Sequence, residues 1–600
     1  MLQSNDNNVV QIPPQETVNN LINLCKQGQF KKVFEHTQIL LKQTPKVYMF
    51  WNIMGVSASQ LEMHDIAIQA YNNAITLNSD FSEAYFNMGI TFTKQGKFDE
   101  AINAYRKTVS LNPNHIDAYN NMSNIYLQHG KLNEAIEGLK KALSIRPTFA
   151  EAHNNLGLIY LRQEKIKQAL EAFQKTISLN PKHAAAHNNM GCILRDTGKF
   201  NEAEEIFKKS VSLKPNYAQA YNNLGICYQF QDKLDEAIET YNTCILLKPD
   251  YAYALNNLAG CYKNKGNFEE ALNTYEKALL KKPDYPEAYY NSSFIYNLKG
   301  DLRKGLELYE WRLKKKNPKA RLPRNHLIWD GIESIKGKKF FVYEEQGLGD
   351  VIQFCRYLLL LKQKGAEVTF KVQRKMHALL QTMDSNIILV ENDPDDKEID
   401  FEAPLMSLMY LFNTNLKTIP SSKSYLFANQ DKVISWWKSL NKTAFKIGIC
   451  WQGNTLQSEV GRSFPLSLFE DISKLQNVEL ISLHKGEGEK QIKDIKFDLT
   501  TFNHDFDDGE SSFIDTASVM VNCDLIISCD TSIAHLAGAL GCPIWVALKK
   551  IPEWRWMLDR TDSPWYPNMR LYRQKELGEW KPVFETMKKD LAKLIKQKIK

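Results

Sequence analysis

Residues 116–149 read IDAYNNMSNIYLQHGKLNEAIEGLKKALSIRPTF, and residues 150–183 read AEAHNNLGLIYLRQEKIKQALEAFQKTISLNPKH. Both segments are 34 residues long, and they place an asparagine pair, an alanine and a proline at equivalent positions. The same spacing extends over much of the chain, because prolines recur at positions 113, 147, 181, 215, 249 and 283. Self-similarity with a period of about 20–50 residues predicts a repeat architecture in which each unit stacks on its neighbours.

The order of small residue, alanine, aromatic residue and proline within each period resembles the tetratricopeptide repeat, a pair of antiparallel helices. Small residues let the two helices approach closely, and aromatic residues fill the gap to the next pair. Each proline starts the next helix, where its missing N–H is not needed. Eight units fill residues 48–319, and a degenerate ninth covers 14–47. We therefore expect an all-α tetratricopeptide-repeat superhelix over 14–319, after a disordered N-terminus at 1–13.

One recurring residue is not needed for packing. Asparagine stands at the sixth position of seven consecutive repeats, at Asn87, Asn121, Asn155, Asn189, Asn223, Asn257 and Asn291. In a stacked array these amides would form a ladder along the concave groove, where they donate to and accept from an extended chain. The ladder resembles that of protein O-linked N-acetylglucosaminyl transferases, which implies a protein or peptide acceptor. The alternative is that the asparagines only cap and link neighbouring repeats.

From Lys338 onward, short β-rich runs alternate with helical stretches, which is typical of βαβ units. One set of runs is KKFFVYE, AEVTFKV and NIILV; the second is KIGICW, VELISL, DLIIS and PIWVAL. A helix-like stretch, DKVISWWKSL, separates the two sets. We expect two facing, doubly wound Rossmann-like domains at 338–438 and 439–600, joined to the repeats by a linker at 320–337. Ligands of such sheets bind beyond the carboxyl ends of the strands, so the chemistry should lie between the halves.

The first candidate loop, Glu344-Glu-Gln-Gly-Leu-Gly-Asp350, follows the run KKFFVYE directly. Gly347 and Gly349 permit close backbone approach, and Asp350 opens the next helix. No Gly-Lys-Ser/Thr is present, and Ile352 replaces the third glycine of a dinucleotide fingerprint, so both of those nucleotide sites are excluded. Asp350 is either a general base for an acceptor hydroxyl or a helix N-cap.

The second candidate loop begins where the buried run DLIIS ends, at Asp530, Thr531 and Ser532. Free N–H groups at the start of the following helix, with two hydroxyls, predict a site for a phosphate or diphosphate. His535 lies about one turn into that helix, close enough to donate to the same anion as a protonated imidazole. The alternatives are ordinary N-capping and a buried, structural histidine. Lys485, Arg462 and Arg555 are further cations that could reach a diphosphate.

The glycine–aspartate loop and the segment DTSIAHLAGALGCP (530–543) resemble the heptosyltransferase family of inverting glycosyltransferases. More narrowly, the chain resembles bacterial proteins that join tetratricopeptide repeats to a heptosyltransferase-like domain. The motifs that carry this resemblance are Glu345–Asp350, Gln353–Tyr357, Trp451–Asn454, Arg462–Ser463, Asp515–Ala517 and Asp562–Pro567. The resemblance implies a GT-B fold of two facing sheets and a nucleotide diphosphate sugar donor, with no metal and no cofactor.

Position by position, this resemblance assigns roles to the two loops. Asp350 matches the family's catalytic base, and Asp530, Thr531 and His535 match its nucleotide-sugar-phosphate loop. Ser532 stands where glycine is common in true heptosyltransferases, so heptose itself is not implied as the donor sugar.

Composition excludes several other classes of protein. The net charge of +7 on 600 residues is mild, which argues against a dedicated nucleic-acid binder. Ten cysteines without a C-x-x-C pair form neither a zinc ribbon nor a redox motif. No apolar stretch approaches the roughly 20 residues of a membrane span, and the first residues do not resemble a signal peptide. We expect a cytoplasmic protein, in which the acidic runs 393–396 and 505–508 are solvated loops rather than metal sites.

The preferred function is transfer of a sugar to a protein or peptide acceptor held along the asparagine ladder. A second enzymatic function has a glycan or lipid-linked acceptor, with the basic C-terminal helix in peripheral contact with a membrane. The simpler interpretation of that helix is that its apolar stripe, which includes Val583, Met587 and Leu591, packs on the second sheet. A third interpretation is a non-catalytic repeat scaffold with a degenerate sugar-nucleotide-binding domain.

Overall fold

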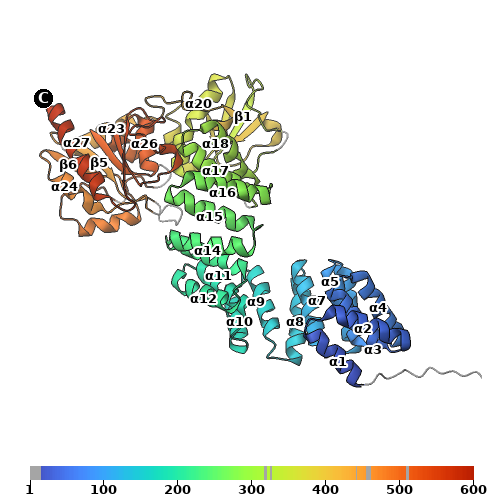
Figure 1. Cartoon of the computed structure of the whole chain (residues 1–600). Coiled ribbons are helices and arrows are strands. Elements are labelled where there is room, and N and C mark those ends of the chain that lie inside the picture. Colours follow the sequence, from blue (N-terminus) through green and yellow to red (C-terminus); the bar gives the residue numbers. More distant parts are fainter. Residues whose placement is uncertain are drawn as a thin grey trace, which may run out of the picture. The chain divides into compact units, whose positions relative to one another are not determined.

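The computed structural model describes residues 15–316, 321–324, 327–440, 442–453, 461–503, 505–508 and 512–599. The N-terminal stretch predicted to be disordered, 1–13, lies outside these residues. The chain divides into two compact units, residues 1–231 and 232–600. Each unit is described by itself (Figure 1).

The first unit is a succession of antiparallel helix pairs. Its helices are α1 (Gln15–Lys26), α2 (Phe30–Gln43), α3 (Tyr48–Gln60), α4 (His64–Leu77), α5 (Ser82–Lys94), α6 (Phe98–Leu111), α7 (Ile116–Gln128), α8 (Leu132–Ile145), α9 (Ala150–Arg162), α10 (Ile166–Leu179), α11 (Ala184–Asp196), α12 (Phe200–Leu213) and α13 (Ala218–Phe230). From α3 onward, every second helix begins 34 residues after the one before. The predicted helical repeat is therefore confirmed.

The recurring glycines and aromatics pack against each other inside a repeat. A Cβ added to Gly157 would lie 2.6 Å from the ring of Phe173, and one added to Gly89 would lie 2.6 Å from Tyr105. Both rings are almost fully buried. The sequence analysis placed these rings between neighbouring pairs; the structure shows that each lies directly on the glycine of its own pair. The glycine is needed because the ring occupies the space that a side chain would fill.

The recurring prolines do not start helices as predicted, with the exception of a further proline, Pro286, at the first position of α17 (Pro286–Leu298). Each lies in the turn between repeats, three residues before the next helix begins. The residue before the proline is extended, for example Asn112 with φ −129° and ψ 88°. Proline disfavours a helical conformation in the residue before it, so it ends the preceding helix.

The second unit begins with the remaining repeats and continues into two sheets. Its repeat helices are α14 (Leu234–Leu247), α15 (Ala252–Lys265), α16 (Phe268–Lys281), α17 and α18 (Leu302–Tyr309). The last helix is short and continues as a 3₁₀ turn, η1 (Glu310–Lys314). Leu298, Leu302, Leu306 and Tyr309 from this last pair share one hydrophobic core with the first sheet. The final repeat is therefore built into the α/β part of this unit.

Two parallel sheets follow. The first has the order β3-β2-β1-β4, with strands β1 (Lys339–Tyr343), β2 (Glu367–Lys371), β3 (Ile388–Val390) and β4 (Phe401–Pro404). The second has the order β6-β5-β7-β8-β9, with strands β5 (Phe445–Cys450), β6 (Val478–Ser482), β7 (Leu525–Cys529), β8 (Ile544–Leu548) and β9 (Met569–Arg573). The strand order of the second sheet reverses direction between β5 and β7, as in doubly wound folds.

Helices and 3₁₀ turns connect the strands. Those of the first sheet are α19 (Leu348–Phe354), α20 (Arg356–Gln363), α21 (His377–Leu380) and α22 (Leu408–Leu411), and α23 (Gln430–Ser439) leads to the second sheet. Those of the second are α24 (Glu470–Ser473), α25 (Ile514–Val521), α26 (Ser532–Leu540), η9 (Trp554–Trp556) and α27 (Lys581–Ile599). Both faces of the second sheet are buried, which explains why its strands β5, β7 and β8 are nearly all apolar.

The C-terminal helix α27 packs on the second sheet. Val583, Phe584, Met587 and Leu591 belong to the same buried core as Trp451 of the strand end. The simpler interpretation of its apolar stripe is therefore confirmed. Among the described residues, no helix combines the length and the apolar character that a membrane span requires.

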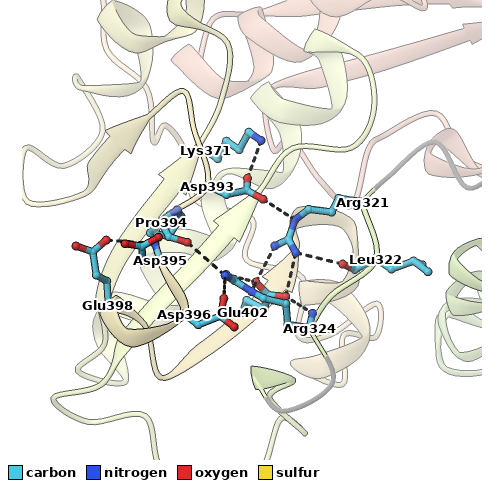
Figure 2. A network of polar contacts seen from close by, with 10 residues as sticks. All are labelled: Arg321, Leu322, Arg324, Lys371, Asp393, Pro394, Asp395, Asp396, Glu398 and Glu402. Atoms are coloured by element: carbon cyan, nitrogen blue, oxygen red, sulfur yellow. Dashed lines mark hydrogen bonds and ion pairs between the residues drawn. The ribbon is translucent and has the colours of Figure 1, made fainter.

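The stretch predicted as a linker (320–337) is held against the first sheet in its described parts. Arg321 and Arg324 both pair with Glu402 of β4, whose side chain is fully buried (Figure 2). Asp393 receives Arg321 at 3.0 Å and Lys371 at 2.6 Å. The acidic run 393–396 is therefore exposed but ion-paired, rather than simply solvated, because it lies beside these arginines.

Candidate functional site

A cleft of about 1440 Å³ lies at the carboxyl ends of the strands in the second unit. It is lined from the first sheet by the loop after β1, and from the second sheet by the residues that follow β5 and β7. The β5–β7 gap is the point where the strand order reverses, which is where doubly wound sheets bind ligands. The last repeat contributes a third wall through α17 and η1.

The cleft brings together residues predicted from distant parts of the sequence. Its lining includes Gly347, Gly349, Asp350, Asp530, Thr531, Ser532, His535 and Asn291. Of the asparagine ladder, Asn257 is in the same unit but not in this lining, and Asn87, Asn121, Asn155, Asn189 and Asn223 belong to the first unit. Lys485, Arg462 and Arg555, which the sequence analysis named as further cations, line the cleft as well.

Asp350 lies at the third position of α19 and makes two interactions. Its Oδ2 accepts a hydrogen bond from the Gly347 N–H at 3.0 Å, which caps the helix. Its Oδ1 forms an ion pair with Arg555, which comes from η9 beside the second sheet. A carboxylate has about four lone-pair sites, so both oxygens retain capacity to accept a further proton donor. Capping and base catalysis are therefore compatible at this position.

The two glycines of the loop differ in their surroundings. A Cβ on Gly349 would lie 3.1 Å from His535 Cδ2 and 3.5 Å from Ser532 Cα. A Cβ on Gly347 would meet only Asp350, at 3.7 Å. Gly349 thus allows α19 to pack closely against the start of α26, so that the two predicted loops meet.

The donor-loop histidine is neutral rather than protonated, contrary to the sequence prediction. Burial holds the pKa of His535 well below its usual range, and the charges of Arg555, Arg356 and Arg462 lower it further. The ring stacks on Trp556, and Nδ1 lies 3.1 Å from the Tyr566 hydroxyl. When Tyr566 donates to Nδ1, the imidazole proton is on Nε2, and a neutral His535 can still donate one hydrogen bond.

A buried arginine cage supports this histidine from below. Arg356 donates to the backbone oxygens of Gln353 and Trp565, each at 2.7 Å, and to the Tyr425 hydroxyl at 2.8 Å. Its guanidinium also lies 4.7 Å from the Tyr566 ring centre. The motifs 353–357 and 562–567 therefore meet in the interior, where they place a cation and the Tyr566 hydroxyl behind His535.

The final repeat holds the loop that carries Asp350. Arg312 of η1 donates to Glu345 at 2.7 Å, and their side chains are only 7% and 1% exposed. Next to this pair, Gln346 Nε2 donates to the Tyr309 hydroxyl at 2.7 Å. Arg312 also binds Ser407 and Glu310. Sequence analysis missed these residues because they lie where the repeat pattern breaks down, and the basic, aromatic end of the last unit was the available signal.

The asparagine ladder is used for bonds between repeats. Asn155 donates to Asn120 at 2.8 Å, and equivalent bonds 35 residues apart recur along the array: Asn87 to Asn52, Asn189 to Asn154, Asn223 to Asn188 and Asn291 to Asn256. Each such amide keeps a second N–H and a second lone pair. The linking interpretation is therefore supported for these asparagines, while groups for a peptide ligand remain.

Other motif residues have structural roles. Asp507 accepts from the backbone N–H of Asp515 at 2.8 Å and binds the Thr516 hydroxyl, so it caps α25. Asp507 is therefore half-buried and not part of a solvated loop, as had been expected, and burial raises its pKa. Lys485 donates to the Phe506 carbonyl at 2.6 Å. Asn454 of the motif Trp451–Asn454 lies outside the described residues.

Comparison with protein families identifies the repeats. Residues 29–248 match a family described as the cilia and flagella-associated protein 70 C-terminal domain. Residues 231–293 match the family described as tetratricopeptide repeat. Protein FlbA of Caulobacter vibrioides (strain ATCC 19089 / CIP 103742 / CB 15) is 24% identical over 288 residues, which are 44% of this chain and 48% of FlbA. The match thus spans about half the length of this curated relative.

Solved structures are similar over parts of the chain. A chain of the APC/C hetero-tetramer Cut9–Hcn1 is 19% identical, with 46% of this chain and 54% of that chain covered and a TM-score of 0.39. YrrB, a TPR protein with an unusual peptide-binding site, is 26% identical, with 31% and 97% covered and a TM-score of 0.26. The family match and the helix pairs that recur every 34 residues show that the chain is a tetratricopeptide-repeat protein.

Proposed function

We propose that this protein is a glycosyltransferase that moves a sugar from a nucleotide diphosphate sugar to a hydroxyl of a protein or peptide acceptor. The two parallel sheets would be the halves of a GT-B fold. The observation that carries the proposal is the convergence in one cleft of Asp350, the loop Asp530–His535 and Asn291. These groups belong to three separate parts of the sequence, and each was singled out for a different step of the same reaction.

The proposed reaction is a single displacement that inverts the anomeric carbon. The acceptor hydroxyl attacks this carbon while Asp350 takes its proton, and the bond to the phosphate oxygen breaks. Negative charge then grows on the departing nucleoside diphosphate. N–H groups at the start of α26 and the neutral His535 would stabilise that charge, because donors fixed in advance need no reorganisation.

The repeats would supply the acceptor. Ligand pockets usually have volumes of about 300–1,000 Å³, so a cleft of about 1440 Å³ leaves room beside the donor. Its repeat wall carries Tyr290, Asn291 and Phe294 of α17. A lipid-linked acceptor is less well supported, because the apolar stripe of α27 is buried against the second sheet.

The test is release of nucleoside diphosphate from a panel of UDP-, GDP- and ADP-sugars, with and without Asp350→Asn. Asparagine keeps an oxygen for the Gly347 N–H but cannot take a proton. General base catalysis typically contributes about 10²–10⁴-fold, so turnover should fall by that order. Asp562→Asn is the matched control, since Asp562 pairs with Arg560 at the surface.

Two results would contradict the proposal in different ways. Near-normal turnover by the Asp350→Asn variant would remove Asp350 from the mechanism. If the unmodified chain neither binds nor turns over any of these donors, the scaffold interpretation replaces the enzymatic one.

A further inference from the structure

Arg555 is the cleft residue that connects the two predicted loops. It belongs to η9, and its side chain is 8% exposed. One Nη binds Asp350 from the first sheet, and the other binds Glu553 at 2.6 Å. Its charge also reaches His535, where it is one cause of the lowered pKa. A single guanidinium therefore interacts with both the predicted base and the predicted donor loop.

The two carboxylate partners of Arg555 are not equivalent. Glu553 is two residues away and also accepts the Arg555 backbone N–H at 2.9 Å, so it is fixed by the same loop. Asp350 reaches Arg555 across the cleft and has a second donor, the Gly347 N–H. The Asp350 contact is thus the one that can be lost without leaving either partner uncompensated.

Arg555 also has unused binding capacity. Its Nε is buried and has no hydrogen-bond partner among the described residues. A buried N–H without a partner is unfavourable, and a diphosphate offers several anionic oxygens to a guanidinium fork. Asp350 offers a single negative charge, so a diphosphate beside α26 would be the stronger partner.

We propose that Arg555 exchanges Asp350 for the diphosphate of the donor, so that donor binding releases Asp350 to act as the base. This inference rests on the proposed function and adds an order of events to it. Before the donor binds, Arg555 occupies Asp350; afterwards Arg555 stays with Glu553 and holds the phosphates. Asp350 then keeps only its Gly347 contact and faces the acceptor hydroxyl.

The exchange predicts opposite effects of two substitutions on one affinity. UDP, GDP and ADP are each titrated calorimetrically into the full chain, and the nucleotide that binds is kept. Asp350→Asn removes the competing carboxylate, so that nucleotide should bind several-fold to about tenfold more tightly. Arg555→Gln removes the phosphate donor and should weaken binding by roughly 10- to 100-fold. Arg560→Gln, at a surface ion pair outside the cleft, is the matched control and should change nothing.

A double-substitution cycle completes the test. In the Arg555→Gln background, Asp350→Asn should no longer tighten binding, because the carboxylate then competes for nothing. Where Arg555→Gln does not fold, Arg555→Lys keeps the charge without the fork and should weaken binding less. Equal nucleotide affinity in the unmodified chain and Asp350→Asn would overturn the exchange alone. Absence of binding by all three nucleotides would overturn the proposed function and the exchange with it.

Discussion

The repeat array and the cleft are built by different rules. In the array, each residue type recurs every 34 positions and contacts its own or the adjacent repeat, as Phe173 does with Gly157. In the cleft, one contact is made per residue pair and partners are far apart in sequence, as in Arg312–Glu345 and Arg555–Asp350. A defect in the array is therefore one of several equivalent losses, whereas a defect in the cleft has no duplicate.

The largest expected effect is the loss of a cleft pair. Arg312→Met would leave Glu345 buried without its cationic partner. Removing one member of a buried ion pair typically destabilises by about 3–5 kcal/mol. Ten of the eleven tryptophans lie after residue 231, so tryptophan fluorescence during urea unfolding reports the second unit. The control is Arg303→Met, an exposed position of the same repeat; an equal loss in both variants would show that the pair is not special.

A smaller effect is expected from the ladder. Replacing Asn155, Asn189 and Asn223 together by alanine removes three bonds between repeats. A buried hydrogen bond contributes about 0.5–1.5 kcal/mol, so the sum should be roughly 2–4 kcal/mol. The loss should appear in the helical circular dichroism signal and not in the tryptophan signal. An array that unfolds unchanged, with acceptor use reduced, would instead assign the ladder to peptide binding.

Asn291→Ala is the matched variant for that experiment. It removes one such bond, to Asn256, but Asn291 also lines the cleft. We expect sugar transfer to fall more than stability does. The two variants together separate the linking role of the ladder from a role in acceptor binding.

The sequence predicted the array well because periodic packing is recorded many times over. It also predicted strands β1, β5, β7 and β8, whose buried faces make them continuously apolar. It missed β4, which is four residues long and contains Glu402 and Pro404, and β9, which alternates Arg570 and Arg573 with apolar residues. Such edge strands lack the apolar run that identifies a central strand.

The cleft was predictable only in its parts. Glycine, aspartate and histidine in loops after strands indicated a ligand site, and the loops do meet. The partners Arg312 and Glu553 could not be assigned, because no spacing relates them to the residues they bind. The neutral state of His535 depends on burial and on three arginines from distant segments, which a local motif does not reveal.

Glycine substitutions should distinguish the two regions further. Gly157→Ala forces a methyl group into the buried Phe173 ring, and overpacking of this kind costs about 1–3 kcal/mol. Alanine recovers up to about 1 kcal/mol of that through its helix propensity. Gly349→Ala meets His535 at the looser distance of 3.1 Å, so stability should change by less than about 1 kcal/mol. Turnover should fall instead, because His535 and Ser532 move; reduced stability with normal turnover would contradict the role of this contact.

The smallest expected effect is a pH dependence confined to the second unit. The pKa of Glu402 reflects burial, which raises it, and the opposing contacts with Arg321 and Arg324, which leave it below the ordinary 4.5. A carboxyl with a lowered folded-state pKa stabilises above its unfolded pKa, and that contribution is lost as pH falls from about 4.5 through the folded value. One pKa unit corresponds to about 1.4 kcal/mol, so an effect of that order is expected. Urea unfolding of Glu402→Gln and the unmodified chain, followed by tryptophan fluorescence from pH 7 to pH 3, measures it. The gap between them should narrow below pH 4.5, while the circular dichroism signal of the array should differ little between the two proteins at any pH. A gap that stays constant into acid would mean that the charge of Glu402 is not what anchors residues 321–324 to the first sheet.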